Sequence, residues 1–191
     1  TNLGKTISDY NFFSYQFAEA LHVSKKERQL VLDSFQKIRS ELSQGVDKHS
    51  KELVVANIEL FLKYCLRFYD RQFITREKEN RGVIKIFKTS LNSYIHTGKA
   101  KEFGTPSVNF FAEQQHLSAN YFGDLVKKET GISAHELIQA KIIEVAKEKI
   151  FDQTKSLSEI AYELGFKYPQ HFTRLFKNKV GYSPNEFRKM N

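Results

Sequence analysis

Apolar residues recur at intervals of three and four positions through most of this chain, a spacing typical of amphipathic α-helices. A first helix is predicted between Ser24 and Gly45, because Ser24 and Glu27 have the spacing of a capping box. A second helix over 50–72 is apolar on nearly all faces, as in a central helix covered on both sides. A third is predicted over 81–96. The apolar positions of the first and third helices are Val31, Phe35, Ile38, Leu42, Ile84, Phe87, Leu91 and Ile95. These helices predict either an antiparallel bundle or a dimer-forming hairpin.

The C-terminal stretch 156–191 has a different pattern of short helices separated by glycines. A capping box at Ser156 and Glu159 predicts a short helix, and Gly165 can adopt the positive φ that ends it in a tight turn. A longer helix is predicted over 169–180. Its buried stripe consists of Phe172, Leu175 and Phe176. A short helix, a glycine turn and a longer helix together have the plan of a helix-turn-helix.

A degenerate copy of this unit lies earlier in the chain, over 107–137. Ala112 and Leu117 match Ala161 and Phe166 at an offset of 49 residues, and four further positions match at an offset of 50. These are Phe122, Leu125, Lys127 and Gly131, which match Phe172, Leu175, Lys177 and Gly181. The change of offset falls in the turn, where an insertion costs least.

The repeat divides the chain into two expected domains, 1–104 and 105–191. The second contains helix-turn-helix units at 107–131 and 156–181, joined by a bridging helix over 134–152 and followed by a helix over 184–190. Residues 98–106 are expected to form a linker. Residues 1–23 are rich in aromatic side chains without a clear period. Since Thr1 is not an initiator methionine, we expect a longer natural protein.

Composition favours an all-α fold, because three prolines and nine glycines leave little room for a many-turned β architecture. The single cysteine excludes an internal disulfide and, without a Cys-x-x-Cys motif, an ordinary zinc finger. The longest apolar run, 53–62, is too short to cross a membrane, and no signal peptide is evident. We expect a cytoplasmic protein without metal or cofactor.

Net charge is +8, but its distribution indicates the partner better than its total. Residues 166–191 contain six basic residues and one acidic residue, although residues 101–191 as a whole carry only +2. The positive charge of this half is therefore concentrated on the second helix-turn-helix and the C-terminus, as expected for contact with a polyanion.

The patterns I-A-x-x-x-G-F, F-x-x-x-F-K and G-x-S-P-x-E-x-R resemble the second helix-turn-helix of the AraC/XylS transcription regulators. They are formed here by Ile160, Ala161, Gly165, Phe166, Phe172, Phe176, Lys177, Gly181, Ser183, Pro184, Glu186 and Arg188. The resemblance covers about 105–190 and implies a bacterial, non-enzymatic regulator that binds double-stranded DNA and contacts RNA polymerase. Residues 24–96 are similar only in general character to the connecting region of the family. The sensor domain that usually precedes that region is absent from this sequence.

The second recognition helix offers five polar residues as DNA contacts: Gln170, His171, Thr173, Arg174 and Lys177. Arg174 can make a bidentate contact with guanine, Gln170 can contact adenine, and Lys177 can bind phosphate. His171 and Thr173 suit either role. The alternative is an ordinary solvated helix face.

The first recognition helix, capped by Ser118, is expected to face outward with Asn120, Tyr121, Asp124 and Lys127. Asp124 departs from the family pattern, which tends to place polar or basic residues there. A carboxylate can only accept hydrogen bonds, so it needs a cytosine amino group or is repelled by phosphate. Base contact and simple docking both remain open for this helix.

Other candidate chemistry has simpler interpretations. His116 stands where the second unit has Gly165, and histidine tolerates the left-handed conformation, so a role in the turn is expected. Cys65 lies on an apolar stripe. No catalytic constellation is evident. The apolar stripe over 54–68 predicts a homodimer through 24–96. The rival to DNA binding is a helical protein–protein interaction module.

Overall fold

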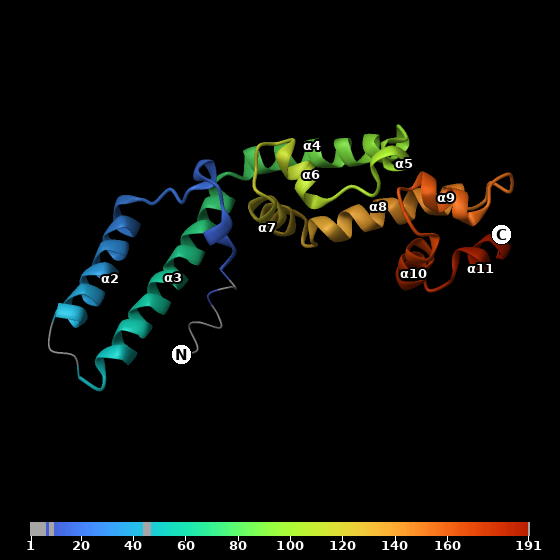
Figure 1. Cartoon of the computed structure of the whole chain (residues 1–191). Helices are drawn as coiled ribbons and strands as arrows, with labels where there is room; N and C mark the ends of the chain where they lie inside the picture. The colour runs from blue at the N-terminus through green and yellow to red at the C-terminus, as the bar shows by residue number, and fades with distance from the viewer. Residues whose placement is uncertain (1–6, 8–9, 44–46, 191) are drawn as a thin grey trace. The chain divides into compact units, whose positions relative to one another are not determined.

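The computed structural model describes residue 7 and residues 10–43 and 47–190, and within these ranges the regular elements are helices and none is a strand (Figure 1). The all-α prediction is confirmed. The elements are η2 (Asn11–Ser14), η3 (Phe17–Glu19), α2 (Lys25–Ser43), α3 (Ser50–Thr75), α4 (Glu77–His96), α5 (Lys99–Phe103), α6 (Val108–Glu113), α7 (Ala119–Thr130), α8 (Ala134–Lys149), α9 (Leu157–Glu163), α10 (Pro169–Val180) and α11 (Pro184–Lys189). The chain forms two compact units, Thr1–Glu79 and Asn80–Asn191.

In the first unit, α2 and α3 pack side by side as a helical hairpin (Figure 1). The rings of Phe35 and Phe61 meet between them, with centroids 5.0 Å apart. The aromatic segment before α2 packs on α3, where the rings of Phe12 and Tyr15 lie 5.4 and 5.2 Å from that of Tyr69. This explains the aromatic residues for which the sequence showed no period.

Polar side chains of α3 form hydrogen bonds with the same N-terminal segment. The backbone N–H of His22 donates to the Gln72 side-chain oxygen at 2.8 Å, and the amide of Gln72 donates to the carbonyl of Ala20. Arg71 donates to Glu27 at 2.7 Å and to the carbonyl of His22 at 2.6 Å. The hairpin is therefore held at one end by hydrogen bonds and in its middle by apolar contacts.

The hairpin leaves much of its apolar surface uncovered within its own unit. The exposed large side chains of α2 and α3 are Leu30, Leu32, Phe35, Leu42, Leu53, Leu60, Leu66 and Ile74. A shallow groove along α2 is lined by Leu32, Phe35, Gln36, Arg39, Ser40 and Ser43. Of the two arrangements expected for 24–96, a three-helix bundle is wrong, because the third helix packs elsewhere.

That third helix, α4, covers the first helix-turn-helix from Asn80 onward. The ring of Phe87 is fully buried and makes edge-on contacts with Phe111 of α6 and Phe122 of α7, at 5.0 and 5.1 Å. The ring of Tyr94 contacts Phe110 in the same way, at 5.1 Å. The apolar stripe of α4 is thus part of the second unit's core. The boundary between units lies at 79/80, earlier than the expected 104/105.

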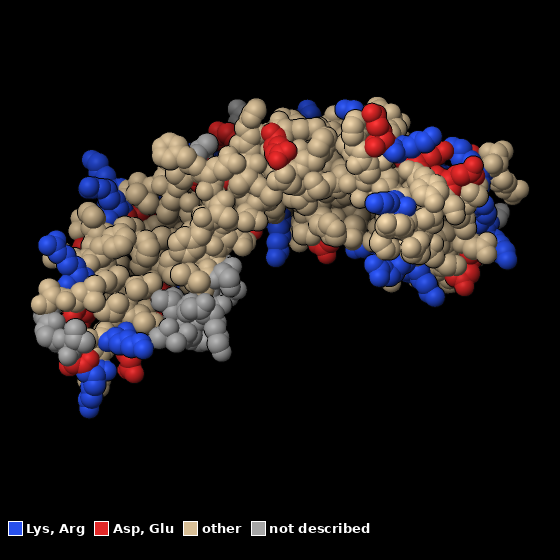
Figure 2. All heavy atoms as spheres, viewed as in Figure 1, with Lys and Arg blue, Asp and Glu red and all other residues tan. Residues whose placement is uncertain are grey.

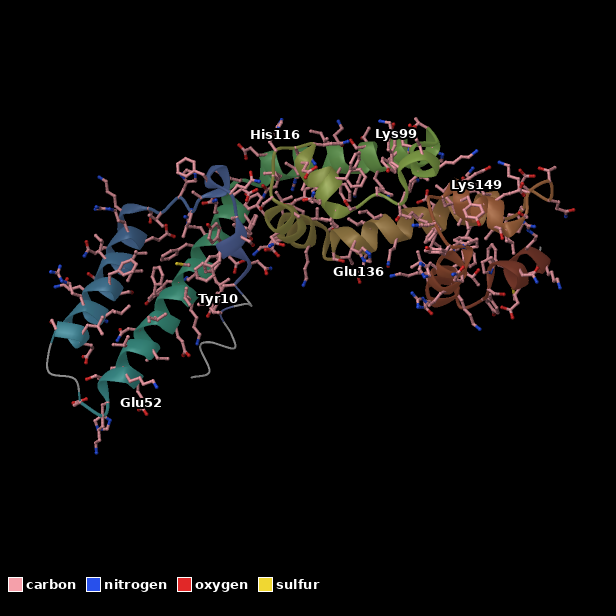
Figure 3. All side chains as sticks on the ribbon, in the orientation of Figure 1. Tyr10, Glu52, Lys99, His116, Glu136 and Lys149 are labelled. Atoms are coloured by element: carbon pink, nitrogen blue, oxygen red, sulfur yellow. The ribbon has the colours of Figure 1, made fainter. Side chains whose placement is uncertain are left out.

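Helix α8 connects the two helix-turn-helix units through a buried stripe of its own. Its buried residues are Ala134, Ile138, Ile142, Ile143, Val145 and Ala146. Its 16 residues span on the order of 24 Å. A complete capping box of Ser133 and Glu136 begins it, and Figure 3 shows Glu136 at this end of the helix.

Candidate nucleic-acid interface

The second helix-turn-helix consists of α9, a glycine turn and α10. Ser156 and Glu159 form the predicted capping box of α9, with the Ser156 N–H donating to the Glu159 carboxylate at 2.7 Å. Gly165 has φ 89°. The N–H of Phe166 donates to the carbonyl of Ala161 at 3.0 Å, which closes the turn. Helix α10 then starts at Pro169, the favoured first position for proline.

Aromatic packing fixes the orientation of α10. The side chains of Phe172 and Phe176 are buried. The ring of Phe172 lies 5.5 Å from that of Phe166, and the ring of Phe176 lies 5.5 Å from that of Phe187 on α11. Because this stripe faces inward, the opposite face of α10 must face solvent.

The five residues predicted on α10 as DNA contacts are all exposed: Gln170, His171, Thr173, Arg174 and Lys177. At about 100° per residue, Gln170, Arg174 and Lys177 share one strip of the helix. The Thr173 hydroxyl donates to the carbonyl of Pro169 at 3.2 Å, so its oxygen remains an acceptor. No acidic residue occurs on α10, and Lys177 and Lys179 lie in its last turn. Figure 2 shows several Lys and Arg side chains over this end of the second unit.

Two further candidate DNA contacts, Lys167 and Tyr168, lie immediately before α10. The sequence analysis did not select them because they belong to the turn. Tyr168 is 47% exposed, and its ring lies 5.5 Å from that of His171. The Lys167 ammonium stands 5.6 Å from the centre of the Tyr168 ring. The N-terminal residues of a recognition helix are those that approach base edges, which is the signal that could have identified this pair.

The first helix-turn-helix repeats the same turn with a different residue in the left-handed position. His116 has φ 56°, as its alignment with Gly165 predicted (Figure 3). The N–H of Leu117 donates to the carbonyl of Ala112 at 3.0 Å, the counterpart of the Phe166–Ala161 bond. The same backbone hydrogen bond therefore closes both turns, and its two copies lie 49 residues apart in the sequence.

Helix α7 presents less outward surface than the sequence suggested. Asn120 and Lys127 are exposed and Asp124 is partly exposed. Tyr121, expected to face outward, is only 4% exposed, so that expectation is wrong. The buried stripe of α7 consists of Tyr121, Phe122, Leu125 and Val126, two residues more than the pattern of Phe122 and Leu125 implied.

Charges of both recognition helices act on one carboxylate at the start of α8. Hydrogen bonds from Ser133 are the main reason why the pKa of Glu136 is lowered, and the charges of Lys179 and Lys127 lower it further. These lysines belong to the last turns of α10 and α7. The C-terminal ends of both recognition helices are thus within electrostatic reach of the same end of α8.

An ion-pair cluster joins the C-terminal end of α8 to the second helix-turn-helix. Glu163 of α9 accepts from Lys149 at 2.7 Å and from Lys155 at 2.5 Å, and these bonds lower the pKa of Glu163. Arg188 of α11 donates to the carbonyls of Ile150 and Lys155, at 2.6 and 3.1 Å. The end of α8 is therefore hydrogen-bonded to the helices on both sides of α10.

Other kinds of site find no support in the part of the chain that the structure describes. No group of three or more His, Cys, Asp or Glu side chains there could hold a metal ion. No helix among the described residues is long and apolar enough to cross a membrane. Cys65 is buried in α3, and burial raises the pKa of its thiol.

Comparison with known proteins gives several relatives that are named as transcription regulators. An uncharacterised HTH-type transcriptional regulator of Bacillus subtilis, YfiF, is 27% identical over 161 residues, which are 84% of this chain and 48% of that protein. A similar regulator of Escherichia coli, YijO, is 24% identical over 98% of this chain and 62% of its own length. The transcriptional regulatory protein YesN of Bacillus subtilis is 36% identical over 95 residues, or 26% of its length. These are named as regulators rather than enzymes, and the chain spans only part of each.

Among solved structures, the C-terminal domain of the response regulator AraT from Geobacillus stearothermophilus is similar, with a TM-score of 0.46 and 25% identity over 55% of this chain and 85% of that one. The family described as "Helix-turn-helix domain" matches residues 111–190. That range begins within α6 and ends after α11, so it contains most of the first helix-turn-helix, the whole of the second and the helix between them. Residues 111–190 of this chain therefore match a helix-turn-helix domain.

Proposed function

We propose that this protein regulates transcription by binding specific sequences of double-stranded DNA, with α10 as its principal recognition helix. The observation that carries this proposal is the face of α10 opposite its buried phenylalanines. That face is polar and basic, contains no carboxylate, and is exposed throughout. Such a face suits the negative potential of a major groove.

Within that face, the side chains divide by the atoms they can bind. Arg174 has the planar fork that suits the O6 and N7 atoms of guanine, and Gln170 has the amide that suits adenine. Lys177, one turn further along the helix, is a compact charge suited to phosphate. His171 and Thr173 flank this strip. Arg174 and Gln170 would select the base sequence, and the phosphate contact of Lys177 would set the position of the helix.

Helix α7 is proposed as the second DNA contact, with a smaller share of the affinity. Its outward residues Asn120, Asp124 and Lys127 include a carboxylate, which phosphate repels unless a cytosine amino group donates to it. With α8 spanning on the order of 24 Å, the two helices would enter successive segments of the major groove, about 34 Å apart.

A dimer through the first unit is also proposed. The exposed apolar side chains of α2 and α3, of which Phe35 and Leu42 are 52% and 63% exposed, form more apolar surface than a solitary helix pair usually leaves in water. Light scattering at micromolar concentration should give the mass of a dimer. A mass of one chain up to high concentration would contradict this part of the proposal.

The resemblance of the C-terminal motifs to AraC-type regulators also suggests a cytoplasmic protein that contacts RNA polymerase at the promoter. A two-hybrid or crosslinking assay between this chain and polymerase subunits on a selected DNA site tests that step.

Selection from a randomised DNA pool, followed by sequencing of the bound fraction, tests DNA recognition directly. We expect a bipartite motif with two half-sites about one helical turn apart, and an affinity that falls steeply with salt concentration. A protein–protein interaction module, the rival function, would enrich no motif. It would also show at most weak binding, equal for all sequences.

A further inference from the structure

Segment 98–106 does more than link α4 to α6. It contains the short helix α5, whose Ala100 is fully buried, and α5 is in contact with α9 of the second helix-turn-helix (Figure 1). The backbone N–H of Thr105 donates to the carbonyl of Gly165 at 3.1 Å. The segment therefore touches the turn between α9 and α10, about sixty residues further along the sequence.

The fit at Gly165 is too close for any side chain. A Cβ atom there would lie 2.5 Å from the carbonyl carbon of Gly104, 2.6 Å from the nitrogen of Thr105 and 2.8 Å from the carbonyl oxygen of Ala100. All three are backbone atoms, which cannot move aside as a flexible side chain can. Gly165 is thus required for two reasons, its positive φ and this contact between backbones.

The same part of the segment is also hydrogen-bonded to α4, which packs on the first helix-turn-helix. The Tyr94 hydroxyl of α4 donates to the carbonyl of Gly104 at 3.1 Å. The ring of Tyr94 is buried against Phe110 and Phe111 of α6, at 5.1 and 6.3 Å. One glycine residue, Gly104, therefore lies between the core of the first helix-turn-helix and the turn of the second.

We propose that residues 98–106 act as a brace that fixes the second helix-turn-helix relative to the first and so sets the DNA half-site spacing that the protein accepts. A single connecting helix such as α8 can twist and bend along its length. A second point of attachment, away from the axis of α8, restricts that motion. Tyr94, Gly104, Thr105 and Gly165 are the positioning residues. The DNA part of this inference rests on the proposed function; the brace itself does not.

Two glycines give a matched test of the brace without DNA. Gly165 and Gly181 have φ of 89° and 91°, so an alanine is strained to a similar extent at either position. Nothing lies within 4 Å of a Cβ at Gly181, however. We expect amide hydrogen exchange at Thr105 to become faster in Gly165→Ala and to stay unchanged in Gly181→Ala. Equal effects of the two variants on Thr105 would overturn the brace.

A gentler variant covers the case in which Gly165→Ala unfolds the second unit. Tyr94→Phe removes only the hydroxyl that binds Gly104 and keeps the buried ring. We expect faster exchange at Thr105 in this variant too, with amide protection in α10 retained. Unchanged exchange at Thr105 would show that this hydrogen bond does not hold the segment in place and would overturn the role given to Tyr94.

DNA with altered spacing tests the consequence for specificity. One added base pair rotates a half-site by about 34° around the duplex, and we expect the wild type to lose at least about tenfold in affinity. Tyr94→Phe should lose clearly less, while its affinity for the second half-site alone stays unchanged. An identical spacing penalty in Tyr94→Phe and wild type would overturn the inference. If the wild type binds no DNA, the proposed function fails, and the exchange experiment still decides whether the brace exists.

Discussion

The position of α4 makes a strong prediction about stability, because Phe87 lies where the sequence placed a separate helical bundle. Its ring is 0% exposed and makes edge-on contacts with Phe111 and Phe122. Truncation of a fully buried phenylalanine costs about 3–5 kcal/mol, which includes the loss of aromatic pairing and the cavity left behind. Since the free energy of unfolding of small domains is only about 5–15 kcal/mol, Phe87→Ala should remove a large part of it from the second unit.

The chain offers a matched control in Phe35, which belongs to the first unit and is 52% exposed. Phe35→Ala should cost about 1 kcal/mol or less, because half of its ring already faces solvent. The two units can unfold separately, so a single melting curve is not enough. Residue-resolved hydrogen exchange in mild denaturant reports on each unit by itself.

The expected pattern is loss of protection in α6, α7 and α8 of Phe87→Ala, with α3 unaffected. The opposite pattern, in which α3 loses protection and α7 does not, would mean that α4 packs on the helical hairpin. A decrease of less than about 1 kcal/mol in the free energy of unfolding of the second unit would mean that the ring of Phe87 is not buried as described.

Further predictions concern the recognition helices and the ion-pair cluster around Glu163. Arg174→Ala should lose about 1–3 kcal/mol on a selected site and relax preference at one or two base pairs. Lys177→Ala should weaken binding to all sequences alike and lower the salt slope by about one, which a salt titration on selected and scrambled DNA measures. In the same titration Asp124→Ala should not weaken binding; a loss equal to that of Arg174→Ala would show that Asp124 contacts a base. Glu163→Gln should cost about 1 kcal/mol at pH 7. Because the folded pKa of Glu163 lies below its ordinary value of 4.5, this difference from wild type should be complete above pH 4.5 and disappear as the pH falls through the folded pKa. A difference that persists in acid would contradict this account of the cluster.

The features predicted correctly from the sequence depend on chemistry within a few residues. Ser156 and Glu159 cap α9 because the side chains of a serine and a glutamate three residues apart satisfy each other's backbone N–H groups, whatever the rest of the fold does. His116 takes the left-handed conformation because its position in the repeat corresponds to a turn glycine. The buried positions Phe172 and Phe176 of α10 followed from spacing alone, since apolar residues at i and i+4 share one face, whereas Leu175 at i+3 is only partly buried.

The features that were missed depend on partners distant in sequence. The stripe of α4 correctly indicated a buried face, but periodicity does not say which surface covers that face, and Phe87 packs on α6 and α7. Tyr121 stands at the edge of its stripe, and a tyrosine there is buried or exposed according to its neighbours. The second role of Gly165 depends on the backbone of residues 100–105, which no local pattern around the turn reveals.

The unequal faces of the two recognition helices explain why their relative orientation matters. Helix α10 has a broad exposed face without a carboxylate, whereas α7 buries Tyr121 and carries Asp124 on its outer side. A weak contact adds usefully to a strong one only when it is held close to its target, because the gain depends on its effective concentration there. A freely rotating first helix-turn-helix would lose most of that gain to the entropy of alignment. With rigid attachment through α8 and residues 98–106, the weak DNA contact of α7 would add affinity only when a second half-site lies at one particular spacing. Specificity would then arise from the geometry of the two helices as well as from base contacts.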